Sequence, residues 1–303
     1  MDPEAVLAVM AYLAAVLASL SSPAPHHPWA GHAGGLACYC LTDVAGALDE
    51  ILSYPWRVAV VEASEAPPGL PRMLHGRGAG LVLGYVNAGY AEEWRSYMER
   101  LRGAGVVHEP AGYEGEYLVE LWSREWLEAV LSEARRVIEA GYDGVYLDNI
   151  DAYLAVEGRP WAAGADPQAA MVELVCTVSE EVRTLKPGAR VYINIGSAVE
   201  LLYNDTLLSC IDGVLREELW STAAGDTVEP QDPWETLEAL DALWQAASRG
   251  KTVIVSDPVA GPEDARRLCS RAWSRGWLPV PQPIDAWDYS RPPPVGWCTR
   301  RSS

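Results

Sequence analysis

The strongest constraint on the fold is an alternation along the chain of short apolar runs and longer amphipathic ones. Eight runs have the length and composition of buried strands, at residues 36–41, 57–63, 81–87, 116–121, 144–149, 190–195, 213–217 and 252–257. Segments with helical periodicity follow most of them, at residues 45–52, 91–102, 126–140, 167–185, 198–208, 233–248 and 262–275. Strands separated by helices run parallel, and eight of them can close on themselves. We therefore predict an α/β fold, a single-domain (β/α)8 TIM barrel.

An open, doubly wound parallel sheet is the competing architecture for such an alternation. Sheets of that kind usually carry a GxGxxG motif directly after the first strand, and nothing similar follows residues 36–41. We therefore retain the closed barrel and assign it to residues 36–290. Residues 1–35 are assigned to an apolar N-terminal segment and a linker rich in Pro, His and Gly, and residues 291–303 to a C-terminal tail.

Residues 5–20 are almost wholly apolar and precede a stretch rich in Ser, Pro and His. The run is short for a membrane span, but its length suits the apolar region of a secretory signal. Asp2 and Glu4 stand where such a signal carries positive charge, so an ordinary packed helix is the alternative. The first interpretation predicts an extracellular or surface-anchored protein that meets a membrane only through this segment. The second predicts a cytoplasmic protein.

The charge balance restricts the possible partners. The chain has 42 acidic residues against 23 basic ones, for a formal net charge of −19. A surface of that sign repels phosphate backbones, so we expect no nucleic-acid partner. It attracts cationic ligands, such as polymers of amino sugars, although acidity also serves solubility alone.

Cysteine and histidine positions argue against a zinc site. The six cysteines lie far apart, without CxxC spacing, at Cys38, Cys40, Cys176, Cys210, Cys269 and Cys298. We expect buried thiols, with one or two disulfides if the protein is exported. Beyond the linker the histidines are His75 and His108, and neither falls at the end of a predicted strand. The sequence predicts no metal and no cofactor, with an oxygen-only site of Asp148, Asp151 and Glu217 as the alternative.

Polar residues gather at the carboxyl ends of the predicted strands, where barrels of this type place their catalytic groups. These residues are Glu62, Asn87, Asp148, Asn149, Asn194, Glu217 and Asp257. Side chains alternate along a strand, so Asp148 shares one face with Tyr146, while its aliphatic neighbours suit packing against helices. We therefore expect Asp148 and Glu217 to point into the barrel mouth and to converge across a cleft.

Two carboxyl groups in one cleft suit the hydrolysis of a glycosidic bond. One protonates the leaving oxygen, and the other attacks the sugar or activates water. A separation of about 5–5.5 Å implies retention of configuration, and one of about 6.5–9.5 Å implies inversion. For any single carboxylate, a helix cap or a salt bridge is the alternative role. Aromatic rings on which sugars stack lie near the same rim, at Tyr85, Tyr90, Trp122, Tyr146, Tyr153 and Trp220, although barrel helices also bury such rings.

Four segments resemble motifs of glycoside hydrolase family 114, which contains endo-α-1,4-polygalactosaminidases. They are residues 83–95, 141–153, 212–219 and 251–257. The most specific is the second, which reads Gly-Tyr-Asp-Gly-Val-Tyr-Leu-Asp-Asn-Ile-Asp-Ala-Tyr. The resemblance extends over residues 36–285, nearly the whole predicted barrel, and the four segments follow one another in the family's order.

The resemblance implies a polysaccharide hydrolase with Asp148 as nucleophile and Glu217 as general acid/base. It implies substrate contacts by Glu62, Tyr85, Asn87, Tyr146, Asn149, Asp151, Asn194, Trp220 and Asp257. Glu62 stands where the family usually has Asp, and Tyr90 where it often has Glu, so the substrate preference is expected to differ; a galactosamine polymer is the leading candidate. The alternative is a catalytically silent, carbohydrate-binding barrel at the cell surface, a function that requires no such pair of carboxylates.

Overall fold

Eight parallel strands form the central sheet of the computed structural model, which describes residues 35–298. In spatial order they are β1 (Ala37–Cys40), β2 (Val58–Val61), β3 (Leu81–Asn87), β7 (Gly144–Asp148), β8 (Arg190–Asn194), β9 (Gly213–Glu217), β12 (Thr252–Val259) and β13 (Leu278–Pro283). Every neighbouring pair in this order is parallel. The first and last strands, β1 and β13, lie in contact, so the sheet curls into a barrel. The predicted fold class is confirmed.

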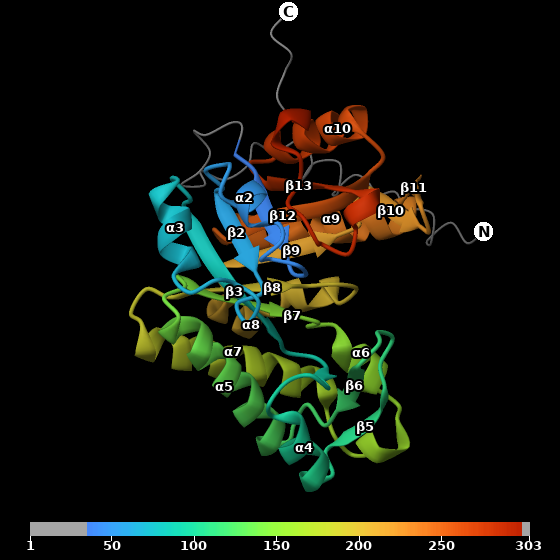
Figure 1. The fold of residues 1–303 in the computed structure, drawn as a ribbon. Coiled ribbons are helices and arrows are strands. Elements are labelled where there is room, and N and C mark those ends of the chain that lie inside the picture. The colour runs from blue at the N-terminus through green and yellow to red at the C-terminus, as the bar shows by residue number, and fades with distance from the viewer. Residues whose placement is uncertain (1–34, 299–303) are drawn as a thin grey trace, which may run out of the picture.

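Helices cover the outside of this sheet (Figure 1). The α-helices are α2 (Leu48–Ile51), α3 (Leu70–Gly76), α4 (Met98–Ala104), α5 (Arg124–Glu139), α6 (Ala152–Val156), α7 (Pro167–Leu185), α8 (Asp205–Cys210), α9 (Pro233–Ser248) and α10 (Pro262–Trp273). Short 3-10 turns are η1 (Pro160–Ala162), η2 (Val199–Tyr203), η3 (Ile284–Ala286) and η4 (Val295–Trp297). Helices α5 and α7 pack side by side against the sheet, and α10 lies against β13. The larger apolar core fills the space between helices and sheet, and a smaller one fills the barrel interior.

One predicted barrel strand belongs to another sheet. Residues 116–121 contain β6 (Glu116–Val119), which pairs antiparallel with β4 (Ala91–Glu92) and β5 (Val107–Pro110) in a separate three-stranded sheet beside α4 and α6 (Figure 1). Within the barrel, β3 pairs directly with β7. Only residues 111–115 join β5 to β6, which suits a hairpin, whereas a parallel crossover needs a dozen or more residues.

The eighth barrel strand is instead β13, which reads Leu-Pro-Val-Pro-Gln-Pro. Its three prolines lack the N–H that a central strand donates, so its sequence does not resemble a strand. Proline is tolerated here because β13 stands at the end of the hydrogen-bonded order, with a ladder to β12 on one side. Strand β12 is consequently the seventh barrel strand and not the eighth.

Some helices have the predicted bounds, and others begin or end at different residues. Helices α7 and α9 have the predicted bounds, and Asp232 caps α9 by accepting from the N–H groups of Trp234 and Glu235 at 2.8 and 3.2 Å. The helix predicted from residue 91 starts only at α4, because Ala91–Glu92 pair with β6. The helix predicted over 198–208 divides into η2 and α8 at Asn204, whose side chain caps α8. A short hairpin, β10 (Ser221–Ala224) and β11 (Thr227–Pro230), was not predicted.

Four of the six cysteines form disulfides. Cys176 of α7 bonds to Cys210 of α8, with Cα atoms 5.1 Å apart. Cys269 of α10 bonds to Cys298, with Cα atoms 5.9 Å apart. The expected state of buried thiols therefore applies to Cys38 and Cys40 alone.

The structure describes part of the predicted C-terminal tail but not the predicted N-terminal segment. The apolar run at residues 5–20 lies outside the described residues. Between residues 35 and 298, no helix combines the length and the apolar character needed to cross a bilayer. Residues 291–298, which the sequence analysis assigns to a tail, are tied to the barrel by the Cys269–Cys298 bond and by a hydrogen bond from Gln282 to the Arg291 carbonyl.

Candidate active site

Three polar side chains end three neighbouring strands of the barrel. Asp148 is the last residue of β7, Asn194 of β8 and Glu217 of β9. Because the strands are parallel and adjacent, their carboxyl ends meet at one rim of the barrel. Two residues earlier on β7, Tyr146 belongs to the interior core, so Asp148 also faces inward as predicted.

The side-chain amide of Asn194 joins the two carboxylates. Its Nδ2 atom donates to Asp148 Oδ1 at 2.9 Å and to Glu217 Oε1 at 3.2 Å. The two N–H bonds of a planar amide diverge by roughly 120°, so these two oxygens lie about 5.3 Å apart when each bond points at its acceptor. Even with the three atoms in line, the two oxygens are at most about 6.1 Å apart, as the two bond lengths require.

Asp148 is a buried carboxylate with several donors. The residue is 8% exposed, and burial raises the pKa of its carboxyl group. Hydrogen bonds from Asn194, from the Asn149 backbone and from the Tyr85 hydroxyl act in the opposite direction and stabilise the anion. Tyr146 is fully buried below it, against the ring of Tyr39 at a centroid distance of 5.3 Å. Tyr146 therefore belongs to the barrel interior beneath Asp148, and its predicted contact with substrate is not supported.

The surroundings of Glu217 stabilise its negative charge less than those of Asp148 do. Burial, and then the negative charge of Asp148, raise the pKa of Glu217 to about 8. The hydroxyl of Tyr289 donates to it, and that hydroxyl also lies 3.3 Å from Ser256 Oγ inside the barrel. A carboxyl group with this pKa holds its proton at neutral pH, as a general acid must.

Asn87 organises the rim beside Asp148. It ends β3 in register with Asp148, and its Oδ1 accepts from the N–H of Gly89 and Tyr90 and from Asn149 Nδ2 at 3.1 Å. Its own Nδ2 donates to Glu116 Oε1 at 3.2 Å. Asn87 is buried, and its Oδ1 and Nδ2 atoms already form hydrogen bonds within the protein. It therefore positions the residues around it and is poorly placed to bind a substrate.

Glu62 and Asp151 were also predicted to contact the substrate, but both carboxylates already bind other groups of the protein. Arg95 Nη2 contacts Glu62 Oε2 at 2.7 Å and Arg95 Nε contacts Glu92 Oε2 at 2.6 Å, with all three side chains nearly buried. Glu62 Oε1 also accepts from the Ser64 N–H. Asp151 is half-buried, which raises its pKa, and its Oδ2 accepts from the Ser197 N–H at 2.8 Å.

The sequence model of glycoside-hydrolase family GH114 matches residues 19–285, most of the chain. The chain belongs to this family. The resemblance seen in the four motifs is thereby confirmed, and so is the general class of carbohydrate hydrolase that the family name describes.

Individual proteins similar to this GH114 chain include two curated ones described only as uncharacterized. A Deinococcus radiodurans protein is 31% identical over 202 residues, 65% of this chain and 62% of the relative. A Thermotoga maritima protein is 30% identical over 237 residues, 73% of this chain and 71% of the relative. The chain thus spans less than two thirds of the Deinococcus protein.

Two solved structures share the barrel. The glycoside hydrolase domain of PelA from Pseudomonas aeruginosa has a TM-score of 0.66 at 15% identity, covering 82% of this chain and 96% of that domain. Aspergillus fumigatus Ega3, solved in complex with galactosamine, has a TM-score of 0.60 at 15% identity, covering 87% of this chain and 97% of Ega3. At this identity the likeness shows a common fold.

Asp257 of this GH114 barrel does not face the barrel interior. Ser256 points inward to Tyr289, so the alternation of β12 turns Asp257 outward to the helix layer. Both of its carboxylate oxygens accept backbone N–H groups, from Leu219 at 2.7 Å and from Trp220 at 3.0 Å. Asp257 therefore fixes the loop that follows Glu217, a structural role in place of the predicted contact with substrate.

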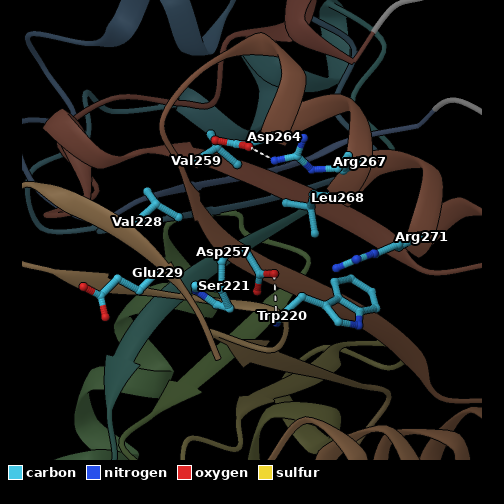
Figure 2. A pocket seen from close by; sticks show the side chains of 11 residues that line it. Trp220, Ser221, Val228, Glu229, Asp257, Val259, Asp264, Arg267, Leu268 and Arg271 are labelled. Atoms are coloured by element: carbon cyan, nitrogen blue, oxygen red, sulfur yellow. Dashed lines mark hydrogen bonds and ion pairs between the residues drawn. The ribbon is translucent and has the colours of Figure 1, made fainter. Parts of the chain in front are cut away.

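Trp220 also lies outside the barrel interior. Its ring stacks on Trp277 with centroids 6.4 Å apart, and the guanidinium groups of Arg271 and Arg275 lie over it at 5.8 and 5.5 Å. Figure 2 shows Trp220 and Asp257 lining a pocket between the β10–β11 hairpin and α10. Because Trp277 and the two guanidinium groups already pack against the Trp220 ring, its predicted stacking on substrate is not supported.

Three residues near Asp148 and Glu217 were absent from the prediction. Glu116 and the exposed Tyr113 come from the β5–β6 hairpin, and the negative charges of Glu217 and Asp148 act, after burial, to raise the pKa of Tyr113. Tyr289 follows β13, the strand hidden by its prolines. The two glycines within residues 111–115 are a hairpin signal that could have located Glu116.

The side chains that could bind a metal are dispersed. Across residues 35–298, the structure groups no three His, Cys, Asp or Glu side chains as potential ligands of one ion. The alternative oxygen-only site of Asp148, Asp151 and Glu217 is therefore not assembled in the described region.

Proposed function

We propose that this chain hydrolyses the glycosidic bonds of a polysaccharide by a retaining mechanism in which Asp148 and Glu217 are the catalytic pair. The observation that carries the proposal is the single amide of Asn194 bonded to both carboxylates. With ideal amide geometry the two oxygens lie about 5.3 Å apart, within the range for retention of about 5–5.5 Å. The upper limit of about 6.1 Å set by the two bonds is below the range for inversion, about 6.5–9.5 Å.

The roles of the pair follow from their environments. Asp148 has three donors that stabilise its anion, so it acts as nucleophile and attacks the anomeric carbon. Glu217, with a pKa raised to about 8 by burial and by Asp148, donates its proton to the glycosidic oxygen as the bond to the leaving sugar breaks. In the second step Glu217 takes a proton from water, the water attacks the anomeric carbon, and Asp148 leaves.

We further propose an amino-sugar polymer as substrate, with α-1,4-linked galactosamine as the first candidate. The rim holds Asp148, whose donors stabilise its anion, and Glu116, which ionises when a cation binds beside it. The nearby cation of Arg95 is already bonded to Glu62 and Glu92. Such a cleft favours a cationic sugar. Ega3, which has the same fold, was solved with galactosamine bound, and this agrees with the choice.

An extracellular or surface location is part of the proposal. The two disulfides, Cys176–Cys210 and Cys269–Cys298, favour an oxidising compartment. A polysaccharide substrate is also more accessible there than in the cytoplasm.

The decisive experiment is digestion of α-1,4-linked galactosamine oligomers, followed by mass spectrometry and by NMR of the first anomer released. We expect shorter products with retained configuration. Asp148→Asn and Glu217→Gln are each expected to reduce kcat/KM more than about a hundredfold. Glu229→Gln, an exposed position on β11, is the matched control and should leave the rate unchanged.

Cleavage that survives in both variants would overturn the assignment of the pair, and an inverted first product would overturn the retaining mechanism. Sugar binding without cleavage by any form would favour the alternative, a carbohydrate-binding barrel without catalysis. The cationic substrate would be wrong if neutral polysaccharides were cleaved faster.

A further inference from the structure

Glu116 reaches the rim near Asp148 from a hairpin outside the barrel. It is the first residue of β6 and lies opposite Glu92 in the antiparallel ladder. The hairpin brings its carboxylate to the end of β3, where Asn87 Nδ2 donates to Oε1 at 3.2 Å. Only 9% of the residue is exposed, and Asn87 itself is in register with Asp148.

The second oxygen of Glu116 has no donor. Among the described residues, none donates a hydrogen bond to its buried Oε2 atom, and no ion pair involves Glu116. Glu92, which lies opposite Glu116, is by contrast paired with Arg95, and so is Glu62. A buried carboxylate oxygen left without a donor is costly, so an oxygen in this state suits a ligand that supplies one.

The charges around Glu116 favour a positive ligand. Burial, followed by the negative charges of Glu92 and Asp148, raises the pKa of Glu116 to about 8. A cation beside Glu116 would offset this repulsion, whereas a neutral hydroxyl would only satisfy the hydrogen bond. The position therefore discriminates between ligands by charge as well as by shape.

We propose that Glu116 is a specificity-determining residue whose Oε2 accepts a hydrogen bond from the ammonium group of the amino sugar bound beside Asp148. The inference rests on the proposed function, since it concerns the sugar on which Asp148 acts. Glu116 distinguishes a free 2-amino group, which carries charge and three donors, from the N-acetyl group, which is neutral and offers one. The recognition is thus supplied by the β5–β6 hairpin and not by the barrel strands.

The test compares Glu116→Gln with the parent on two oligomers of the same backbone, one of galactosamine and one of N-acetylgalactosamine. Glutamine keeps the shape and the acceptor for Asn87 but cannot ionise beside a bound cation. We expect kcat/KM for the galactosamine oligomer to fall about tenfold or more, the effect of losing a charged hydrogen-bond partner, with the N-acetyl oligomer changed less than about twofold. Glu114→Gln, two residues earlier and exposed, is the matched control and should change neither.

Binding measurements separate this inference from the proposed function. Calorimetry with galactosamine and N-acetylgalactosamine on the parent, Glu116→Gln and Glu114→Gln proteins reports recognition without cleavage. A preference for galactosamine that is lost in Glu116→Gln alone supports the inference even if no oligomer is cleaved. Equal loss for both sugars, or an unchanged preference in Glu116→Gln, overturns it, even where the parent cleaves galactosamine oligomers. Absence of galactosamine binding by the folded parent, with thermal melting as the check, overturns it too.

Discussion

Asn194 and Asp148 are linked across neighbouring strands by a hydrogen bond of 2.9 Å from the amide of one to the carboxylate of the other. The same nitrogen continues to Glu217 at 3.2 Å, so the orientation of one side chain sets the spacing of both carboxylates. Asn194 is itself fixed, because its Oδ1 accepts from the N–H of Gly196 at 3.2 Å. The geometry of the proposed pair is therefore set by an amide on the strand between them.

Replacing Asn194 with Ala should reduce kcat by about a hundredfold, because a small displacement of the paired groups is enough for a loss of this size. Asn194 is a positioning residue, so KM should change much less than kcat. Asn204→Ala, which removes the α8 cap, should lower stability by about 1 kcal/mol and leave kcat unchanged. An Asn194→Ala enzyme with the parent kcat would contradict this role.

The pH profile of kcat/KM should be bell-shaped with its alkaline limb near pH 8, where Glu217 loses the proton it donates. The acid limb should lie above the range of an ordinary aspartate, because burial raises the pKa of Asp148. The pKa values that the two limbs report belong to the pair of carboxyl groups and not to either residue alone, because the two groups interact. Rates measured across the pH range check this, and an alkaline limb beyond pH 10 would contradict it.

The raised pKa of Glu217 also predicts how stability depends on pH. A carboxyl with a pKa raised from 4.5 to about 8 stabilises the folded protein fully below pH 4.5, and this contribution is lost as pH rises through about 8. The free energy of unfolding of the parent should therefore fall over this window relative to Glu217→Gln. Denaturant unfolding of both proteins across the window is the measurement, and parallel curves would contradict the assignment.

Replacing Asp257 with Asn should weaken the loop after Glu217. Asparagine retains one acceptor oxygen, so one of the two N–H groups of Leu219 and Trp220 loses its partner. We expect a loss of about 1–3 kcal/mol in the free energy of unfolding, and a lower kcat because Glu217 adjoins that loop. Glu229→Gln, in the same pocket but exposed, is the control. Unchanged stability in Asp257→Asn would show that the loop is held by other contacts.

The sequence by itself determined the barrel and the residues at three strand ends. In the run that ends at Asp148, polar and aliphatic side chains alternate clearly, so local periodicity fixes which side chain faces inward. Parallel strands then bring Asp148, Asn194 and Glu217 to one rim without further information. Their proximity follows from pattern and handedness, which are local properties of the chain.

Only the tertiary structure decided the facing of Asp257 and the arrival of Glu116 and Tyr289. Residues 253–255 are apolar on both faces of β12, so the sequence does not indicate which face turns inward. Glu116 enters from an antiparallel hairpin outside the barrel, and Tyr289 follows a strand of alternating prolines. Their positions depend on which segments pair with which, and such pairings are decided by packing between residues far apart in the sequence.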